Sequence, residues 1–232
     1  MPIENIKRQR RWKGKFDWST DEPELIVYAV NIAKLWLQRE REQKGRITAD
    51  HLDKACGILS EEIFAAELNE LNVPHLRTVP LLNKEHPTNL GKPYDFKIGR
   101  YTVDLKSISP LPPPSGHHWN LNVNKAELGE NQEKICDYYI ATKCLPELPA
   151  EKRPLKNDED LSMKFAYATL KKVEKVQFLG WATGDELCSD NNLVSGYNFY
   201  SKKPPHNPMR SLAKILNIPL ESPATEPLTL NP

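Results

Sequence analysis

The chain has 232 residues, with 32 basic against 31 acidic side chains and a formal net charge of +1. This length favours one core over two independently folded domains, and the balanced charge means that any nucleic-acid-binding signal has to be local. No apolar run approaches the ~18 residues that a membrane-spanning helix needs, so we expect no membrane partner. The N-terminus lacks a secretory pattern and the four cysteines form no C-x-x-C pair, which predicts a cytoplasmic protein without a zinc knuckle or a disulfide framework.

The first twenty residues combine basic and aromatic side chains. Six lysines and arginines between positions 7 and 15 are interleaved with Trp12, Phe16 and Trp18. Such a mixture can contact phosphates and stack on bases, so residues 1–20 are predicted to form an arm that contacts DNA. A solvated arm whose aromatic rings pack back on the body is the alternative. The candidate DNA-binding side chains are Arg8, Arg10, Arg11, Lys13 and, later in the chain, Lys125.

Two helices are predicted after this arm. Apolar residues recur at helical spacing from Leu25 to Trp36, behind a good N-cap and first turn at residues 20–23. The second helix begins near residues 48–50 and ends at Asn72-Val73-Pro74, because the residue before a proline disfavours the helical conformation.

The remainder of the chain predicts strands and loops. A hairpin centred on Gly99 is followed by strand-like segments at 119–123, 137–142 and 176–181. Residues 146–162 are rich in proline and charged side chains, which predicts a loop or insertion.

This order of elements predicts the domain organisation. Two leading helices followed by several strands favour one α/β (α+β) domain over residues 21–218, with a mixed β-sheet flanked by helices and an N-terminal helical extension. The tail at 219–232 contains four prolines and is expected to be disordered or loosely attached.

The stretch around Gly99 has the pattern of a tight hairpin. Gly99-Arg100 is a Gly-X pair of the kind favoured at the centre of a type II′ turn, which sets Asp95 opposite Asp104. Alternation then separates an apolar face from a charged face. The apolar face collects Phe96, Ile98, Tyr101, Val103 and Leu105, and the charged face collects Asp95, Lys97, Thr102, Asp104 and Lys106.

Two aspartates directly opposite each other, with Cβ atoms ~5 Å apart, destabilise a sheet unless their charge is compensated. Mg²⁺ is the natural candidate, because it favours carboxylate oxygens and keeps waters that substrate phosphate oxygens can replace. Lys106 shares a face with Asp104, where it can orient or deprotonate a metal-bound water or stabilise charge on a phosphate. The alternative is a solvated face on which these aspartates form ion pairs with Lys97 and Lys106.

A family resemblance lies in the same stretch. The sequence Pro93-Tyr94-Asp95, then eight residues, then Asp104-Leu105-Lys106 resembles the PD-(D/E)XK motif of the restriction-endonuclease-like nuclease superfamily. It departs from that pattern in one respect, since Tyr94 separates the proline, which binds no metal, from the aspartate. Members commonly have a helix with a glutamate before the hairpin, and a helix and further strands after it. Here residues 60–68 supply the first helix, and residues 176–187 resemble a strand and turn frequent in such nucleases.

The resemblance covers roughly residues 50–190 and implies Mg²⁺-dependent hydrolysis of DNA phosphodiesters, with Mn²⁺ as a substitute metal. It implies Asp95, Asp104 and the backbone carbonyl of Leu105 as metal ligands. It implies Lys106 as the residue that assists the attacking water. A glutamate of the preceding helix is implied as a further catalytic residue, and the apolar helical stripe favours Glu61 over its neighbour Glu62. Either glutamate can instead face solvent.

These observations lead us to expect a metal-dependent DNA endonuclease that works on DNA in the cytoplasm, associated with the nucleoid. The alternatives are a nuclease of the same fold that acts in repair, nicking or junction resolution, and a nucleic-acid-binding module that does not cleave. A homodimer is attractive, because one active site per chain has to cut two strands. No G-x-x-x-x-G-K-[ST] loop occurs, so no ATP-driven motor is expected.

Overall fold

The computed structural model describes most of the central part of the chain and short pieces near its ends. The described residues are 8–10, 16–19, 23–45, 49–78, 94–112, 121–124, 128, 135–189, 192–194, 198–200, 207 and 209–218. Arg11, Lys13, Lys125 and the tail at 219–232, on which expectations were placed above, lie outside these residues.

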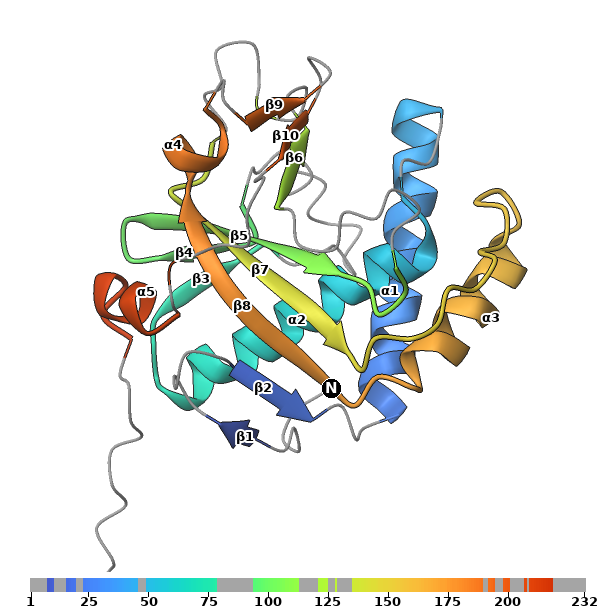
Figure 1. Cartoon of the computed structure of the whole chain (residues 1–232), viewed down its shortest axis with the longest axis horizontal. Helices are drawn as coiled ribbons and strands as arrows, with labels where there is room; N and C mark the ends of the chain where they lie inside the picture. The colour runs from blue at the N-terminus through green and yellow to red at the C-terminus, as the bar shows by residue number, and fades with distance from the viewer. Residues whose placement is uncertain are drawn as a thin grey trace, which may run out of the picture.

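Helices and strands are mixed along the chain (Figure 1). In order they are β1 (Arg8–Arg10), β2 (Phe16–Ser19), α1 (Pro23–Lys44), α2 (His51–Glu70), β3 (His75–Arg77), β4 (Phe96–Ile98), β5 (Tyr101–Ile108), β6 (Asn122–Asn124), β7 (Tyr138–Leu145), α3 (Glu159–Leu170), β8 (Lys175–Thr183), α4 (Gly184–Leu187), β9 (Leu193–Val194), β10 (Asn198–Tyr200) and α5 (Met209–Ile215). Among the described residues, no helix combines the length and the apolar character needed to cross a bilayer.

The strands form a mixed central sheet and a small second sheet. The central sheet has the order β1-β2-β8-β7-β5-β4-β3, and the small sheet has the order β6-β10-β9. In the central sheet β5 and β7 pair in parallel, whereas the other neighbours pair antiparallel. The expected mixed sheet flanked by helices is therefore confirmed.

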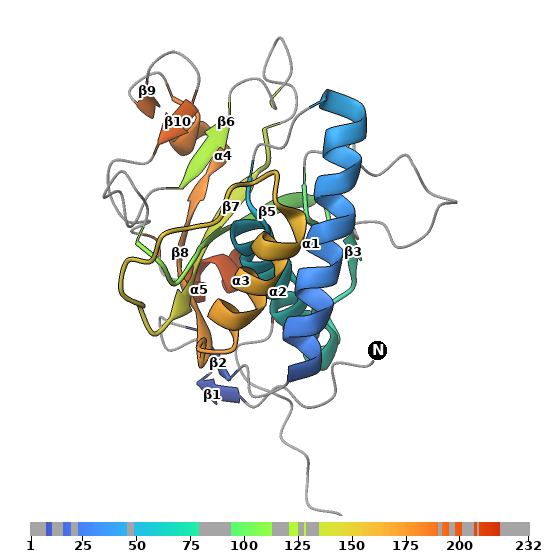
Figure 2. The same ribbon diagram turned by 90° about the vertical axis from the view of Figure 1, so that its right-hand side faces the viewer.

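The two faces of the central sheet are covered differently. Helices α1, α2 and α3 lie on one side, and the small sheet and α4 lie towards the other (Figure 2). Successive residues of β7 show why both faces are apolar: Ile140 belongs to the large hydrophobic core with the helices, while Tyr139 and Ala141 belong to a smaller one with Leu187. Alternating side chains of a central strand thus bury on both sides.

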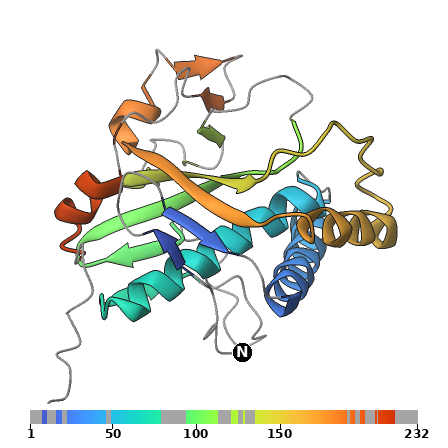
Figure 3. The same cartoon turned by 60° about the horizontal axis from the view of Figure 1, so that its bottom comes forward.

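Helix α2 lies next to the hairpin because its apolar side packs on the central sheet (Figure 3). Phe64 contacts the edge of Phe96 with ring centroids 5.0 Å apart, and its ring lies 5.9 Å from that of Phe178. Aromatic side chains bury large areas in such contacts, and edge-to-face geometry adds roughly 0.5–1.5 kcal/mol. This packing fixes the distance between α2 and the strands that carry the aspartates.

The ends of α2 follow the sequence signals. Asp50 is the N-cap, since its carboxylate accepts a hydrogen bond of 2.8 Å from the backbone N–H of Asp53. After Leu71, Asn72 adopts the left-handed conformation with φ 53°, and Pro74 follows. Both predicted helices and the strands corresponding to β5, β7 and β8 are confirmed.

Three expectations need correction or completion. The predicted loop at 146–162 is wrong in its last part, because Asp158 caps α3, which starts at Glu159. The N-terminal arm contributes β1 and β2, which extend the central sheet beyond β8. The helix implied after the hairpin is not found among the described residues between β5 and β7, where 113–120, 125–127 and 129–134 are not described.

The four cysteines, Cys56, Cys136, Cys144 and Cys188, are all buried, where a free thiol packs as a small apolar side chain. Each of them lies among the described residues.

Candidate active site

The hairpin between β4 and β5 has the predicted register. Phe96 faces Val103, Lys97 faces Thr102 and Ile98 faces Tyr101. Gly99 has φ 59°, and Arg100 is not among the positive-φ residues, which is the combination required by a type II′ turn and excludes type I′.

Asp95 departs from this register. The ladder ends at Phe96, and Asp95 lies in a bend whose backbone N–H donates to the Val103 carbonyl at 3.0 Å. Its carboxylate accepts a hydrogen bond of 2.7 Å from the backbone N–H of Leu105. The expected ladder pairing of Asp95 with Asp104 is therefore wrong, although the two carboxyl groups still contact each other through a side-chain hydrogen bond. The physical reason is that the carboxylate satisfies a backbone donor of β5 that β4 no longer reaches.

Around this bend lies a cavity of about 310 Å³, which we call the acidic pocket. Its walls come from α2, from the start of the hairpin and from the middle of β5, with one residue each from near β6 and from β7. The lining residues are Asp53, Lys54, Gly57, Glu61, Asp95, Asp104, Leu105, Lys106, Ser107, Ile108, Leu121 and Ala141. The structure thus brings together Glu61, Asp95, Asp104, Leu105 and Lys106, the five residues singled out from the motif.

Four carboxyl groups line the acidic pocket, and burial raises the pKa of each; Asp53 pairs with Arg153, and the other three are Glu61, Asp95 and Asp104. Burial, and after it the Glu61 charge, raises the pKa of Asp95 to about 6. Burial raises the pKa of Asp104 to about 7, against the opposing effect of Lys106. Burial also raises the pKa of Glu61 to about 6, against the opposing charges of Arg77 and Lys54. Negative charge gathered in this way is typical of sites that bind a cation.

Lys106 contacts Asp104 directly. Its ammonium lies 2.6 Å from the Asp104 carboxylate, and the side chains are 31% and 12% exposed. The alternative of a solvated face predicted ion pairs between the aspartates and Lys97 or Lys106. The ion pair that forms joins Asp104 and Lys106, two residues apart on the same strand β5. This ion pair balances the charge of Asp104 and leaves that of Asp95 without a direct ion pair among the described residues.

The two adjacent glutamates of α2 face different surroundings. Glu62 is 4% exposed and its carboxylate lies 2.5 Å from the Arg77 guanidinium of β3. Glu61 lies 3.6 Å from Arg77 and lines the acidic pocket. Arg77 therefore holds Glu62 in the interior by the shorter ion pair, whereas Glu61 lies on the side of the aspartates.

Lys54 is a second cation of the acidic pocket that the motif does not contain. Its ammonium lies 3.5 Å from the centroid of the Trp36 ring, which is the geometry of a cation–π contact. Burial lowers the pKa of Lys54, and the charges of Glu61 and Asp95 act in the opposite direction. Its spacing from Glu61 is the sequence feature that could have indicated Lys54, since positions 54, 57 and 61 lie on one side of a helix.

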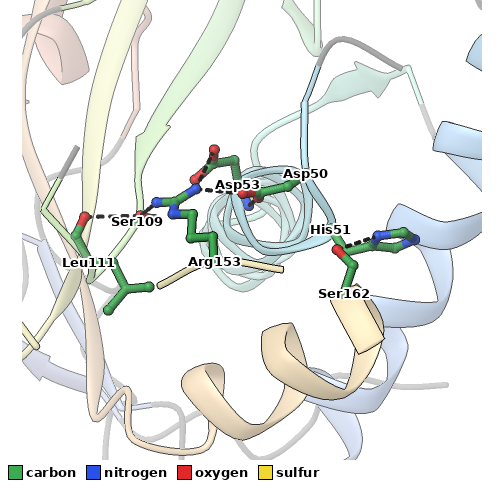
Figure 4. Close-up of polar contacts among 7 residues, drawn as sticks. All are labelled: Asp50, His51, Asp53, Ser109, Leu111, Arg153 and Ser162. Carbon is green, nitrogen blue, oxygen red and sulfur yellow. Dashed lines mark hydrogen bonds and ion pairs between the residues drawn. The ribbon is translucent and has the colours of Figure 1, made fainter. Parts of the chain in front are cut away.

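The start of α2 is held by the loop before α3 (Figure 4). The Arg153 guanidinium lies 2.6 Å from Asp50 and 2.8 Å from Asp53, and it donates to the Ser109 hydroxyl at 2.9 Å. The imidazole of His51 forms a buried 2.9 Å hydrogen bond with Ser162 of α3. Because Asp53 and Lys54 line the acidic pocket, this cluster positions the α2 wall; no sequence motif indicated it.

The donor atoms of the acidic pocket fit a hard divalent cation. No three His, Cys, Asp or Glu side chains of the described part of the chain are grouped closely enough to hold a metal by side chains alone. Mg²⁺ is commonly bound by one or two carboxylates together with waters, which matches Asp95 and Asp104. Leu105 donates its N–H to Asp95, and since the N–H and C=O of a strand residue point to the same side, its carbonyl faces the same gap.

Comparison with known proteins adds no relative. The chain matches no protein family model, no curated protein and no solved structure. The functional argument consequently depends on the geometry and chemistry of the acidic pocket.

Proposed function

We propose that this protein is a Mg²⁺-dependent DNA endonuclease of restriction-endonuclease-like fold, with the acidic pocket as its active site. The observation that carries the proposal is that three carboxyl groups with raised pKa and the Lys106 ammonium surround one cavity. A protein gains nothing in stability from burying such charges together, and perturbed groups of this kind cluster at functional sites.

The order of elements supports the same proposal. Helix α2 precedes the hairpin and packs on it, the hairpin carries both aspartates, and β7 then pairs in parallel with β5. This agrees with the helix, hairpin and mixed sheet that the motif resemblance implies. The fold family remains part of the proposal.

The roles follow from the positions of the side chains. Asp95, Asp104 and the Leu105 carbonyl would hold Mg²⁺, or Mn²⁺ in its place. When bound, the metal lowers the pKa of a water and polarises the phosphoryl group. Lys106, next to Asp104, orients the attacking water or stabilises charge on the phosphate. Glu61 borders the same space from α2.

The test is cleavage of supercoiled plasmid, branched DNA and single-stranded DNA with Mg²⁺ or Mn²⁺. Wild type is compared with Asp104→Asn and Lys106→Met, and with Asp160→Asn on the exposed side of α3 as a matched control. Metal-dependent cutting that both pocket variants lose and the control keeps supports the proposal. The preferred DNA then distinguishes a restriction-like enzyme from one that acts in repair, nicking or junction resolution.

The opposite result is equally informative. Absence of cutting on all three substrates, with DNA bound equally well by wild type and pocket variants, would identify a nucleic-acid-binding module and overturn the enzyme. Light scattering during the same experiments tests the homodimer expected from two-strand cleavage, because a species of 26.6 kDa would be a monomer.

A further inference from the structure

The α2 wall of the acidic pocket carries a cation and a gap. Lys54, Gly57 and Glu61 all line the cavity from this helix. At 1.5 Å per residue, Lys54 and Glu61 are separated by about 10 Å along the helix axis, with Gly57 between them. This wall faces, across the same cavity, the hairpin that carries Asp95 and Asp104.

The Lys54 ammonium is held over an aromatic ring, and the carboxylates of Glu61 and Asp95 act on its charge from beyond ion-pair distance. It lies over the Trp36 ring at 3.5 Å, and within the described residues no carboxylate comes into ion-pair distance of it. An aromatic face attracts the charge but accepts no strong hydrogen bond, so the three N–H donors stay available to a ligand. Lys106, the other lysine among the described lining residues, is already 2.6 Å from Asp104.

Gly57 leaves space where most helices carry a side chain. A Cβ built at this position meets no atom within 4 Å apart from its chain neighbours and the nearby backbone of its own helix, so the backbone of α2 is bare towards the cavity. Glycine inside a helix costs about 1 kcal/mol relative to alanine. The glycine that leaves this space next to Lys54 therefore lowers the stability of the helix.

The charge of the acidic pocket requires a cation on this side. A phosphodiester chain that approaches three carboxylates is repelled, and a bound divalent cation compensates only at its own position. A backbone phosphate next to the one at the metal needs its own positive partner. Lysine is suited to this role as a mobile point charge with three donors.

We propose that Lys54 and Gly57 form a binding position for a backbone phosphate of the nucleic acid, adjacent to the phosphate at Asp95 and Asp104. The proposal rests on the proposed function and names the part of the substrate that the α2 wall recognises. Lys54 supplies the charge, Trp36 fixes the ammonium, and Gly57 gives the phosphate room to lie against the helix.

The test measures binding of a short DNA duplex and of a single strand at several salt concentrations, with Ca²⁺ in place of Mg²⁺ so that binding is read without cutting. Lys54→Met removes the charge, Lys54→Arg keeps it, and Gly57→Met fills the gap. Lys171→Met is the matched control, because Lys171 is an exposed lysine whose ammonium lies 5.6 Å from the Tyr167 ring away from the lining residues.

We expect Lys54→Met to weaken binding about tenfold and to reduce the slope of log K against log salt by about one, as for the loss of one phosphate contact. Lys54→Arg keeps most of the affinity, Gly57→Met loses it without a fall in melting temperature, and Lys171→Met behaves as wild type. Unchanged affinity and slope in Lys54→Met, or an equal loss in Lys171→Met, would overturn this proposal.

Failure of this proposal and failure of the proposed function give different results. A wild type that cuts DNA while Lys54→Met binds and cuts equally well leaves the nuclease in place and removes the Lys54 site. A wild type that neither binds nor cuts any of the DNAs removes both.

Discussion

Replacing Asp104 by asparagine is expected to stabilise the protein at alkaline pH in the presence of EDTA. The Asp104 side chain is 12% exposed, and burial raises its pKa from 3.8 to about 7. At 1.36 kcal/mol per pKa unit, ionising it costs about 4 kcal/mol more in the folded than in the unfolded chain. Side-chain movement and water entry reduce such costs, so we expect a gain of about 2–4 kcal/mol at pH 8.

The sign of the pH dependence follows from proton binding. Between pH 4 and pH 7 the folded state holds a proton on Asp104 that the unfolded state has lost, so wild-type stability falls as pH rises through this range. Asp95 and Glu61, with pKa values raised to about 6, add to the same fall. Asparagine resembles the protonated carboxyl group, so the variant and the wild type should be nearly equal at pH 4.5.

The assay is urea unfolding at pH 4.5 and pH 8, with Asp160→Asn as the exposed control. A gain of 2 kcal/mol corresponds to about 4–8 °C in melting temperature for a chain of this size. Loss of stability in Asp104→Asn at pH 8 would show that the ion pair with Lys106 outweighs burial, and would refute the reasoning from buried charge. An equal effect at both pH values would refute the assignment of the effect to ionisation.

Other expectations concern metal, charge pairs and the α2 gap. Mg²⁺ at ten times its dissociation constant should raise wild-type stability by about 1.4 kcal/mol and that of Asp104→Asn much less; calorimetry showing equal shifts would contradict the metal site. Arg77→Met should lower stability by about 3 kcal/mol in urea unfolding, because it leaves Glu62 buried without its partner, and Glu62→Gln in the same chain should recover part of the loss. Arg153→Met should lower the free energy of unfolding by about 1–2 kcal/mol, and it should reduce DNA cleavage because the start of α2 shifts. Unchanged stability would contradict the role of Arg153 in holding α2. Gly57→Ala should raise the melting temperature by about 1–4 °C, which a loss of stability would contradict.

Local patterns were sufficient for the hairpin and for the start and end of α2. Gly99 adopts the positive φ that a type II′ turn requires, and alternation assigned Phe96 and Val103 to the buried face. Asp50 caps α2 and Asn72 ends it with a left-handed residue. These features depend on neighbours within a few residues, which is why composition and spacing predict them.

The secondary structure of charge-rich segments was predicted less accurately from the sequence. Residues 159–162 carry two acidic side chains and were assigned to a loop, yet Asp158 caps α3 and the helix packs through Ala166 and Leu170 into the core. Short helices owe most of their stability to tertiary packing, so their sequence signal is weak. The two short strands within residues 1–20 are a similar case, since β2 forms by pairing with β8 far along the chain and β1 pairs with β2.

The sequence by itself placed two aspartates, a lysine and a helix glutamate along the chain in the order that the motif resemblance implies. Only the tertiary structure decided which groups meet. Asp95 leaves the ladder to accept the Leu105 N–H, Arg77 of β3 separates the roles of Glu61 and Glu62, and Lys54 joins the acidic pocket over Trp36. These outcomes depend on competition between partners distant in sequence for a few buried donors and charges, and local periodicity carries no information about that competition.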